Sequence, residues 1–279
     1  MVLVDNANTD NMKTVLVPVD FSDVSANALL FAAELCKRAS ARLIIVNILK
    51  KGEDEEEIKN RLESTGANLK KIFGSDLMCE WSFAHGNFIT TLKKITAVQK
   101  PDLIVMGTKG ASGLKEIFIG SNTVKVMGNV NTPVFVIPET ARFENFLDQG
   151  KRRIVLATDL EFFEEEKALN VLKEIALLIK EPKIRVLNVR PENTGLSYEK
   201  RAERSFLLSV FQPEIETQRF TMFSSSVMGG INAYLNENAD TGLIAMMARD
   251  SGHLMQKHYT REMALHTHLP LLVLHDKKV

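Results

Sequence analysis

Short apolar runs alternate along the chain with longer segments whose apolar residues recur every three or four positions. The first run, TVLVPVD at 14–20, is β-branched and ends on an acid, and the segment at 21–39 that follows it has helical spacing. The same alternation predicts further strands at 42–49, 78–83, 102–106 and 133–138, and further helices at 53–73, 87–98 and from 121 onward. The run at 42–49 is continuous and not alternating, which is typical of a strand covered by helices on both faces. The pattern therefore predicts an α/β fold with a doubly wound parallel sheet.

The pattern starts again in the second half of the chain. RRIVLATDL at 152–160 repeats the first strand, so that Asp159 falls where Asp20 fell, and a helical stretch follows at 162–179. Later apolar runs repeat the second, fourth and fifth strands, at 183–189, 241–247 and 269–275. Because the strand endings recur in the same order, we infer a duplication. We expect two homologous domains, at 1–140 and 141–279.

Four glycines follow the fourth predicted strand of the first half, in MGTKGASGLKEIFIGS at 106–121. Glycines permit positive φ and close approach, so that successive backbone N–H groups can converge on phosphate oxygens. A helix start at Ser121 also favours negative charge. The second half lacks the loop, since Met247, Asp250 and Tyr259 stand near three of the glycine positions. We therefore interpret the loop as a ligand-binding feature of the first half, and the second copy as degenerate.

Asp20 ends the first strand, next to the glycine loop at the same edge of the predicted sheet. Open α/β sheets form their ligand crevice at this edge. The carboxylate of Asp20 can accept hydrogen bonds from a ribose or a base, although an acid in this place is also typical of a helix cap. Together with the loop, ligand contact is the better interpretation.

The spacing Gly107-x2-Gly110-x9-Gly120-Ser121, after DLIVM and beside Pro18 to Asp20, resembles the ATP-binding signature of the universal stress protein family. The resemblance covers 13–138 and 152–275 as two tandem copies, and it implies two five-stranded parallel sheets of order 3-2-1-4-5 with ATP across the strand ends. Lys109 stands where the family often has a histidine, and Asn122 where a small apolar residue is common. The resemblance places Pro18, Val19, Asp20 and Ile48 at the adenine and ribose, and Met106, Gly107, Lys109, Gly110, Gly120, Ser121 and Asn122 at the ribose and phosphates.

The resemblance also implies an assembly and a function. Family members commonly pair through their last strands, so 133–138 and 269–275 are expected to pair as an intramolecular pseudo-dimer; a further homodimer stays open. The implied function is an ATP-binding stress-response regulator that binds an adenine nucleotide (ATP, or AMP or ADP) with Mg²⁺ or Mn²⁺ and acts on an unidentified protein partner. A slow ATP hydrolase and a partner-binding protein with a vestigial pocket are the alternatives. The chain has no P-loop and no evident base or acidic metal pair, so we assign no catalytic residue and no metal ligand.

The composition of the chain limits the classes of partner that we expect it to bind. Lysine plus arginine equals aspartate plus glutamate at 35 each, which leaves no global field to attract nucleic acid. The N-terminus lacks the pattern of a signal peptide, and no apolar stretch approaches the roughly 20 residues that span a bilayer. We therefore expect a cytoplasmic protein with neither a nucleic-acid nor a membrane partner. Cys36 and Cys79 lack CxxC spacing, and the late histidines, expected at the surface or at helix caps, are His253, His258, His266, His268 and His275.

Overall fold

The computed structural model describes residues 12–108, 121–144, 153–192, 194–249, 259–260, 262–263 and 268–276. The first half contains β1 (Thr14–Pro18), α1 (Asp23–Ala39), β2 (Arg42–Leu49), α2 (Glu55–Phe73), β3 (Cys79–His85), α3 (Phe88–Gln99), β4 (Leu103–Thr108), α4 (Ser121–Met127) and β5 (Val134–Pro138). The second half contains β6 (Arg153–Ala157), α6 (Glu166–Leu177), β7 (Lys183–Arg190), α7 (Tyr198–Phe211), β8 (Glu216–Phe223), α8 (Val227–Glu237), β9 (Thr241–Arg249) and β10 (Leu271–Asp276). The predicted alternation of strands and helices is confirmed in the first half. In the second half the four predicted strands are confirmed, and α7, β8 and α8 are elements that the sequence analysis did not predict.

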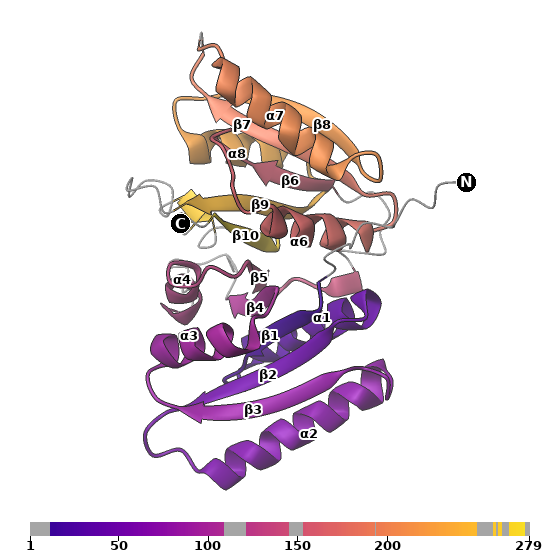
Figure 1. Ribbon diagram of the computed structural model, residues 1–279, viewed down its shortest axis with the longest axis vertical. Coiled ribbons are helices and arrows are strands. Elements are labelled where there is room, and N and C mark those ends of the chain that lie inside the picture. The colour runs from indigo at the N-terminus through magenta and orange to yellow at the C-terminus, as the bar shows by residue number, and fades with distance from the viewer. Residues whose placement is uncertain are drawn as a thin grey trace, which may run out of the picture.

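All of these strands belong to one ten-stranded sheet of order β3-β2-β1-β4-β5-β10-β9-β6-β7-β8. Each half has the predicted order 3-2-1-4-5, and the two halves meet where β5 and β10 pair antiparallel, with Phe135 opposite Leu272. Figure 1 shows the first half below and the second half above this junction. The expected pairing of the two last strands inside the chain is confirmed, and it turns the two expected sheets into one continuous sheet.

The sheet separates two hydrophobic cores. In β1, Val15 and Val17 face the core covered by α1, α2, α6 and α7, whereas Leu16 faces the core covered by α3, α4 and α8. Burial on both faces explains why the strand segments read as continuous apolar runs. None of the helices that the structure describes is long and apolar enough to cross a lipid bilayer.

The first helix of each half begins at a different distance from its strand. In the first half Ser22 caps α1, because its side chain accepts a hydrogen bond from the backbone N–H of Ser25. In the second half the prediction of a helix from 162 is wrong, since α6 begins at Glu166 and Glu165 before it makes no side-chain cap hydrogen bond. Phe163 is fully buried in the core, so this stretch packs as an irregular segment and not as a first helical turn.

A buried histidine contributes to the junction between the halves. His275, near the end of β10, is 7% exposed, and its Nε2 lies 2.7 Å from the carbonyl oxygen of Met127 in the first half. A carbonyl only accepts, so this contact requires the proton on Nε2. The expectation that the late histidines lie at the surface or at caps is therefore wrong for His275.

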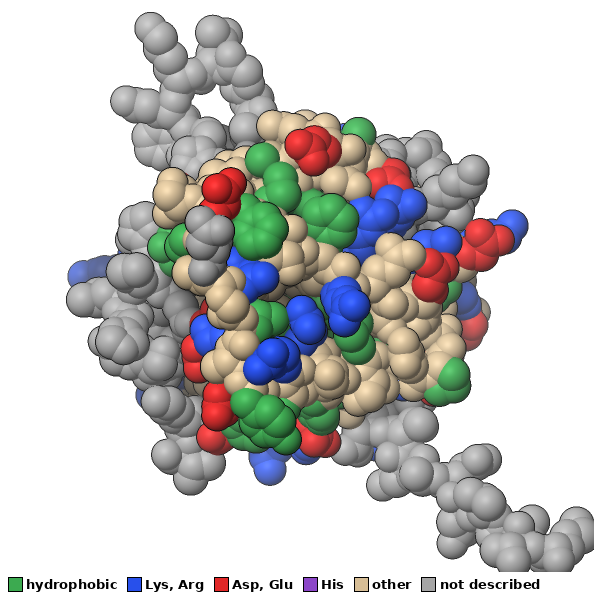
Figure 2. Space-filling view, turned by 90° about the horizontal axis from the view of Figure 1, so that it is seen from above, with side chains coloured by type: hydrophobic (Ala, Val, Ile, Leu, Met, Phe, Trp, Pro, Cys, Tyr) green, Lys and Arg blue, Asp and Glu red, His purple; other side chains and the backbone are tan. Residues whose placement is uncertain are grey.

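The outer edge of the second half carries charged side chains. Figure 2 looks onto the end of the molecule that β7, β8 and α7 form, and lysine and arginine side chains gather near its centre. Burial lowers the pKa of the Arg204 guanidinium, and repulsion from Arg219, Arg190 and Arg201 lowers it further. Charges on an edge strand such as β8 oppose pairing with a strand of another molecule.

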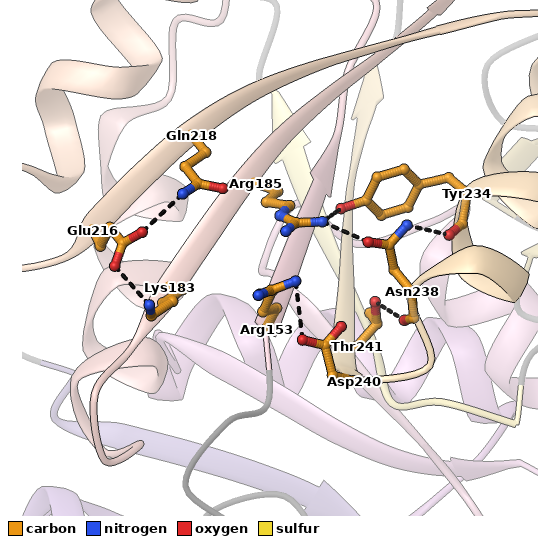
Figure 3. Close-up of polar contacts among 9 residues, drawn as sticks. All are labelled: Arg153, Lys183, Arg185, Glu216, Gln218, Tyr234, Asn238, Asp240 and Thr241. Carbon is orange, nitrogen blue, oxygen red and sulfur yellow. Dashed lines mark hydrogen bonds and ion pairs between the residues drawn. The ribbon is translucent and has the colours of Figure 1, made fainter.

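Polar side chains fill the edge of the second half at which β6 and β7 begin (Figure 3). One guanidinium nitrogen of Arg185 lies 2.6 Å both from the hydroxyl of Tyr234 and from the side-chain oxygen of Asn238. Arg153 forms an ion pair of 3.0 Å with Asp240. These groups bond mainly to one another at the amino ends of the strands, and doubly wound sheets bind ligands at the opposite, carboxyl edge.

Candidate functional site

The carboxyl ends of β1 and β4 border a cavity of about 700 Å³ in the first half. These two strands are neighbours at the point where the strand order reverses, which is where doubly wound sheets bind ligands. The cavity brings together predicted site residues from four separate segments, namely Pro18, Val19, Asp20, Ile48, Met106, Gly107 and Asn122. Four predicted residues remain. Ser121 begins α4, but its side chain is not described. Lys109, Gly110 and Gly120 lie outside the described residues.

Asp20 lies at the mouth of this cavity and its carboxylate is fixed by Ser22. The Oδ1 atom accepts a hydrogen bond of 3.1 Å from the backbone N–H of Ser22 and one of 2.6 Å from the Ser22 hydroxyl. Partial burial by itself raises the pKa of Asp20, but the hydrogen bonds from Ser22 outweigh it and hold the pKa below its usual value. Asp20 is therefore an anion at neutral pH, and it favours hydroxyl or amino donors and repels phosphate.

The residue after Asp20 has an unusual backbone. Phe21 has φ of 59°, in the left-handed region that bulky residues rarely adopt, and Leu160 has the same φ in the second half. This turn directs the chain from β1 into α1 and places the Asp20 carboxylate over the strand end. The guanidinium of Arg61, from α2, stacks 4.1 Å above the centre of the Phe21 ring and also lines the cavity.

Gly107 has a packing role that the sequence alone does not reveal. A β-carbon added there would lie 2.4 Å from the carbonyl oxygen of Val24 in the first turn of α1. The absence of a side chain therefore lets α1 approach β4 closely. The Thr123 hydroxyl also donates a 2.9 Å hydrogen bond to the carbonyl of Gly107, which ties α4 to the same strand end. Gly107 therefore also serves the packing of α1 on β4, a role that the interpretation of the loop as a ligand-binding feature did not include.

Two buried polar side chains were missed by sequence reasoning. Asn47 is 5% exposed, and its amide donates a 2.9 Å hydrogen bond to the carbonyl of Val19, which fixes the end of β1 against β2. The Asn47 Oδ1 and the Thr108 hydroxyl are buried at the cavity with no hydrogen-bond partner among the described residues. Such atoms fit a ligand that supplies donors and acceptors. The signal was present, because an asparagine inside an apolar strand recurs as Asn188.

The cavity carries both signs of charge. Asp20 and Glu53 are its acids, and its cations are Lys50, in the loop after β2, and Arg61, from α2. Glu53 accepts a 2.7 Å hydrogen bond from the backbone N–H of Lys50, which positions the loop after β2. Within the part of the chain that the structure describes, no three histidine, cysteine or acidic side chains lie close enough together to hold a metal ion.

The equivalent edge of the second half keeps the framework but changes the lining. The amide of Asn188 donates a 2.9 Å hydrogen bond to the carbonyl of Thr158, as Asn47 does to Val19. Met247 of β9 lies opposite Leu274 of β10, and Gly107 of β4 lies opposite Ile137 of β5 at the equivalent position of the first half. Among the described residues, the two halves thus share the asparagine that fixes the first strand and differ at the strand end, where a methionine stands in place of Gly107.

Comparison with known proteins identifies similar chains over both halves. The model of the universal stress protein family matches residues 11–138. A universal stress protein of Methanocaldococcus jannaschii is 30% identical over 146 residues, which cover 47% of this chain and 85% of that protein. One of Bacillus subtilis is 27% identical over 143 residues, which cover 44% of this chain and 97% of that protein.

The likeness in structure extends further than the likeness in sequence. The crystal structure of a universal stress protein from Archaeoglobus fulgidus matches with a TM-score of 0.71 at 19% identity, and the match covers 95% of this chain and 98% of that one. Because the identity is low, the match shows only a shared fold, and this shared fold includes both halves of the chain.

Proposed function

The chain belongs to the universal stress protein family, and we propose that its first half binds one adenine nucleotide, with ATP as the main ligand, at the carboxyl edge of β1 and β4. The observation that carries the proposal is the convergence of Asp20, Ile48, Met106 and Asn122, from four segments, on one cavity of about 700 Å³. A volume of this size suits a nucleotide-sized ligand. The resemblance to the ATP-binding signature supports the same ligand.

The lining divides into an apolar end and a polar end. Val19, Ile48 and Met106 offer an apolar surface for the adenine ring. The ionised Asp20 accepts hydrogen bonds from ribose hydroxyls, because its remaining lone pairs are open to donors. Its charge keeps the phosphates away, toward Asn122, the second residue of the short helix α4.

A divalent cation, Mg²⁺ or Mn²⁺, fits this site as a companion of the triphosphate. Bound there it would neutralise charge on the phosphate oxygens. The chain itself would contribute the orientation of the nucleotide through Asp20 and Asn122. Lys109, Gly110, Gly120 and Ser121 complete the proposed phosphate cradle on the strength of the resemblance.

We assign to this binding a regulatory role in the cytoplasm, as a nucleotide-dependent response to stress through a protein partner. Two of the helices that line the cavity are α1 and α4, which are held at the strand end by the approach of Val24 to Gly107 and by the hydrogen bond from Thr123. A ligand in the cavity therefore contacts elements whose outer faces meet the surroundings. Nucleotide binding can therefore change the surface that these helices present to a partner protein.

Isothermal titration calorimetry tests the proposal with ATP, ADP and AMP in the presence of Mg²⁺. We expect saturation at about one nucleotide per chain. Asn122→Asp places a negative charge beside the phosphates and should weaken ATP binding by about tenfold or more. Asn131→Asp is the matched control, because Asn131 is exposed and does not line the cavity. Absence of binding at millimolar ATP, or equal effects of the two variants, would overturn the proposal. Analysis of the nucleotide after incubation distinguishes binding from slow hydrolysis, because a protein that only binds ATP leaves it unchanged.

A further inference from the structure

Four arginine side chains gather at the outer end of the second half, in a different part of the sheet from the nucleotide cavity. This arginine cluster consists of Arg190 at the end of β7, Arg201 and Arg204 in α7, and Arg219 in β8. Arg201 and Arg204 are three residues apart, so they share one face of the helix. Figure 2 shows cationic side chains gathered at this end of the molecule.

The two strand arginines lie on the side of the sheet that α7 covers. The Thr217 hydroxyl donates a 3.4 Å hydrogen bond to the carbonyl of Leu208 in α7, so Thr217 faces the helix. Arg219 lies two residues farther along β8 and has the same orientation, as does Phe223. The guanidinium of Arg190 lies 5.3 Å from the centre of the Phe223 ring. Three elements therefore bring the four guanidinium groups to one surface.

The charges of the arginine cluster repel one another. Burial lowers the pKa of the Arg204 guanidinium, and the charges of the other three arginines lower it further. Arg190 donates a hydrogen bond to the carbonyl of Thr194, which carries no negative charge. In the part of the chain that the structure describes, none of the four arginines forms an ion pair with an acid. A bound anion would offset this repulsion.

The acids of α7 leave the arginine cluster with a net positive charge. Glu203 is buried, and Glu199 is exposed at the start of the helix, where its charge interacts with that of Arg201. The four arginines outnumber these two acids. Lys200 forms a 2.7 Å ion pair with Glu161, so that this pair adds no net charge to the surface.

Protection of the sheet edge explains only part of the arginine cluster. A charge on β8 opposes pairing with a strand of another molecule, and Arg219 serves that purpose. Arg201 and Arg204 lie on a helix, which has no open strand edge to protect. Exposed rings accompany the cluster, since Phe223 is 52% exposed and Tyr198, three residues before Arg201, is 77% exposed. Arginine and exposed aromatic rings together are typical of a surface that binds a partner.

The side-chain chemistry indicates which anion this surface fits. A guanidinium group is a planar fork that donates two hydrogen bonds to one phosphate or carboxylate. A phosphate monoester has nearly two negative charges and three acceptor oxygens, so it can bond several guanidinium groups at once, which a single carboxylate does less well. The chain as a whole has 35 cationic and 35 anionic side chains, so there is no extended positive field of the kind that nucleic acid binding uses. A compact, doubly charged group is therefore favoured over a long polyanion.

We propose that the arginine cluster binds a phosphorylated segment of a partner protein. The phosphate group lies among the guanidinium groups of the cluster, and the side chains next to it in the partner pack on the exposed rings of Phe223 and Tyr198. The first half thus holds the nucleotide site, and the second half presents the docking surface. Binding at this surface does not require the nucleotide, so the two proposals stand or fall separately.

Fluorescence anisotropy on the full chain tests this docking surface. The probe is a short fluorescein-labelled peptide with a central phosphoserine between leucine and phenylalanine, and the same peptide with unmodified serine is its control. Inorganic phosphate and a single-stranded oligothymidylate serve as the competing anions. We expect the phosphopeptide to bind saturably, about tenfold or more tightly than the serine peptide, and to bind less well as the salt concentration rises. Inorganic phosphate should displace it only in large excess, because it lacks the flanking side chains.

Substitutions locate the binding to the arginine cluster. Arg204→Gln and Arg219→Gln each remove one guanidinium group and should weaken phosphopeptide binding by about tenfold. Arg219→Lys keeps the charge but loses the fork, and its affinity should lie between those of Arg219→Gln and the wild type. Arg142→Gln, the same loss of charge at an exposed position of the first half, should leave binding unchanged. Arg219 is exposed, so its substitution leaves the packing of the core intact.

Three results would overturn the inference. These are equal affinities for the phosphopeptide and the serine peptide, equal effects of Arg219→Gln and Arg142→Gln, and binding of oligothymidylate or inorganic phosphate as tight as that of the phosphopeptide. Titration of the phosphopeptide in the Asn122→Asp protein separates this inference from the nucleotide proposal. We expect wild-type phosphopeptide affinity there, whether or not ATP binding is lost, and a parallel loss of both would contradict the independence of the two sites.

Discussion

A single methyl group added at Gly107 tests whether the close approach of α1 to β4 is a requirement of the fold. The β-carbon in Gly107→Ala would lie 2.4 Å from the carbonyl oxygen of Val24 and 2.6 Å from its Cγ1. The side chain of Val24 can rotate, but the carbonyl belongs to the backbone of α1 and can move only with the helix. Overpacking of this kind costs about 1–3 kcal/mol, and we expect a loss of stability in that range.

Urea unfolding followed by tryptophan fluorescence measures this loss. The chain has one tryptophan, Trp81, and it lies in β3 of the first half, so the signal reports the half that contains Gly107. Gly128→Ala is the matched control, because its added β-carbon would have 3.6 Å to the nearest atom, and we expect a change below about 0.5 kcal/mol. If Gly107→Ala unfolds at the same urea concentration and slope as the wild type, the packing role is refuted.

Three further predictions follow from polar and titratable groups. Asn47→Ala removes the hydrogen bond to the carbonyl at the end of β1 and should lower the stability of the first half by about 1–3 kcal/mol in the same urea experiment; an unchanged midpoint would contradict it. The pKa of Asp20 lies below its usual 3.8, since hydrogen bonds from Ser22 outweigh burial, so its stabilisation is present above pH 3.8 and is lost as the pH falls through the folded pKa. Urea unfolding from acid to neutral pH should show the difference between wild type and Asp20→Asn shrinking toward acid, and a constant difference would oppose the assignment. Burial raises the pKa of Cys36, which is 1% exposed, and of the half-buried Cys79, so a thiol reagent should label Cys79 slowly and Cys36 only after unfolding; mass spectrometry identifies the site, and fast labelling of Cys36 would be the contrary result.

The sequence was sufficient for the inner strands because these strands are buried on both faces, whereas the edge strands β3 and β8 are partly exposed and β8 was not predicted. The continuous apolar runs, each followed by a helical period, leave few alternatives to a doubly wound sheet. The pairing of β5 with β10 was expected from the family resemblance, and it covers two strands that would otherwise be open edges. Asp20 could be placed at this edge from the strand pattern because it follows β1, whereas the placement of Asn122 came from the family resemblance.

The contacts that could not be predicted from the sequence depend on how the helices pack against the sheet. The spacing around Gly107 looks the same whether the glycine serves a ligand or the first turn of α1, and only the distance to Val24 separates the two roles. Arg61 resembles any exposed helical arginine until the left-handed turn at Phe21 brings a ring beneath it. His275 is buried because the other half of the molecule covers it, and a local pattern does not report a contact 148 residues away.

The central claim is that the first half, and not the second, holds the nucleotide, and a pair of equivalent substitutions tests it most directly. Asp20→Asn and Asp159→Asn make the same change at matching strand ends and keep the size of the side chain. Titration of both variants with ATP and Mg²⁺ should show binding weakened by about tenfold in Asp20→Asn, because a charged acceptor is replaced by a neutral one, and wild-type binding in Asp159→Asn. Equal affinities in the two variants, or a loss confined to Asp159→Asn, would contradict the account.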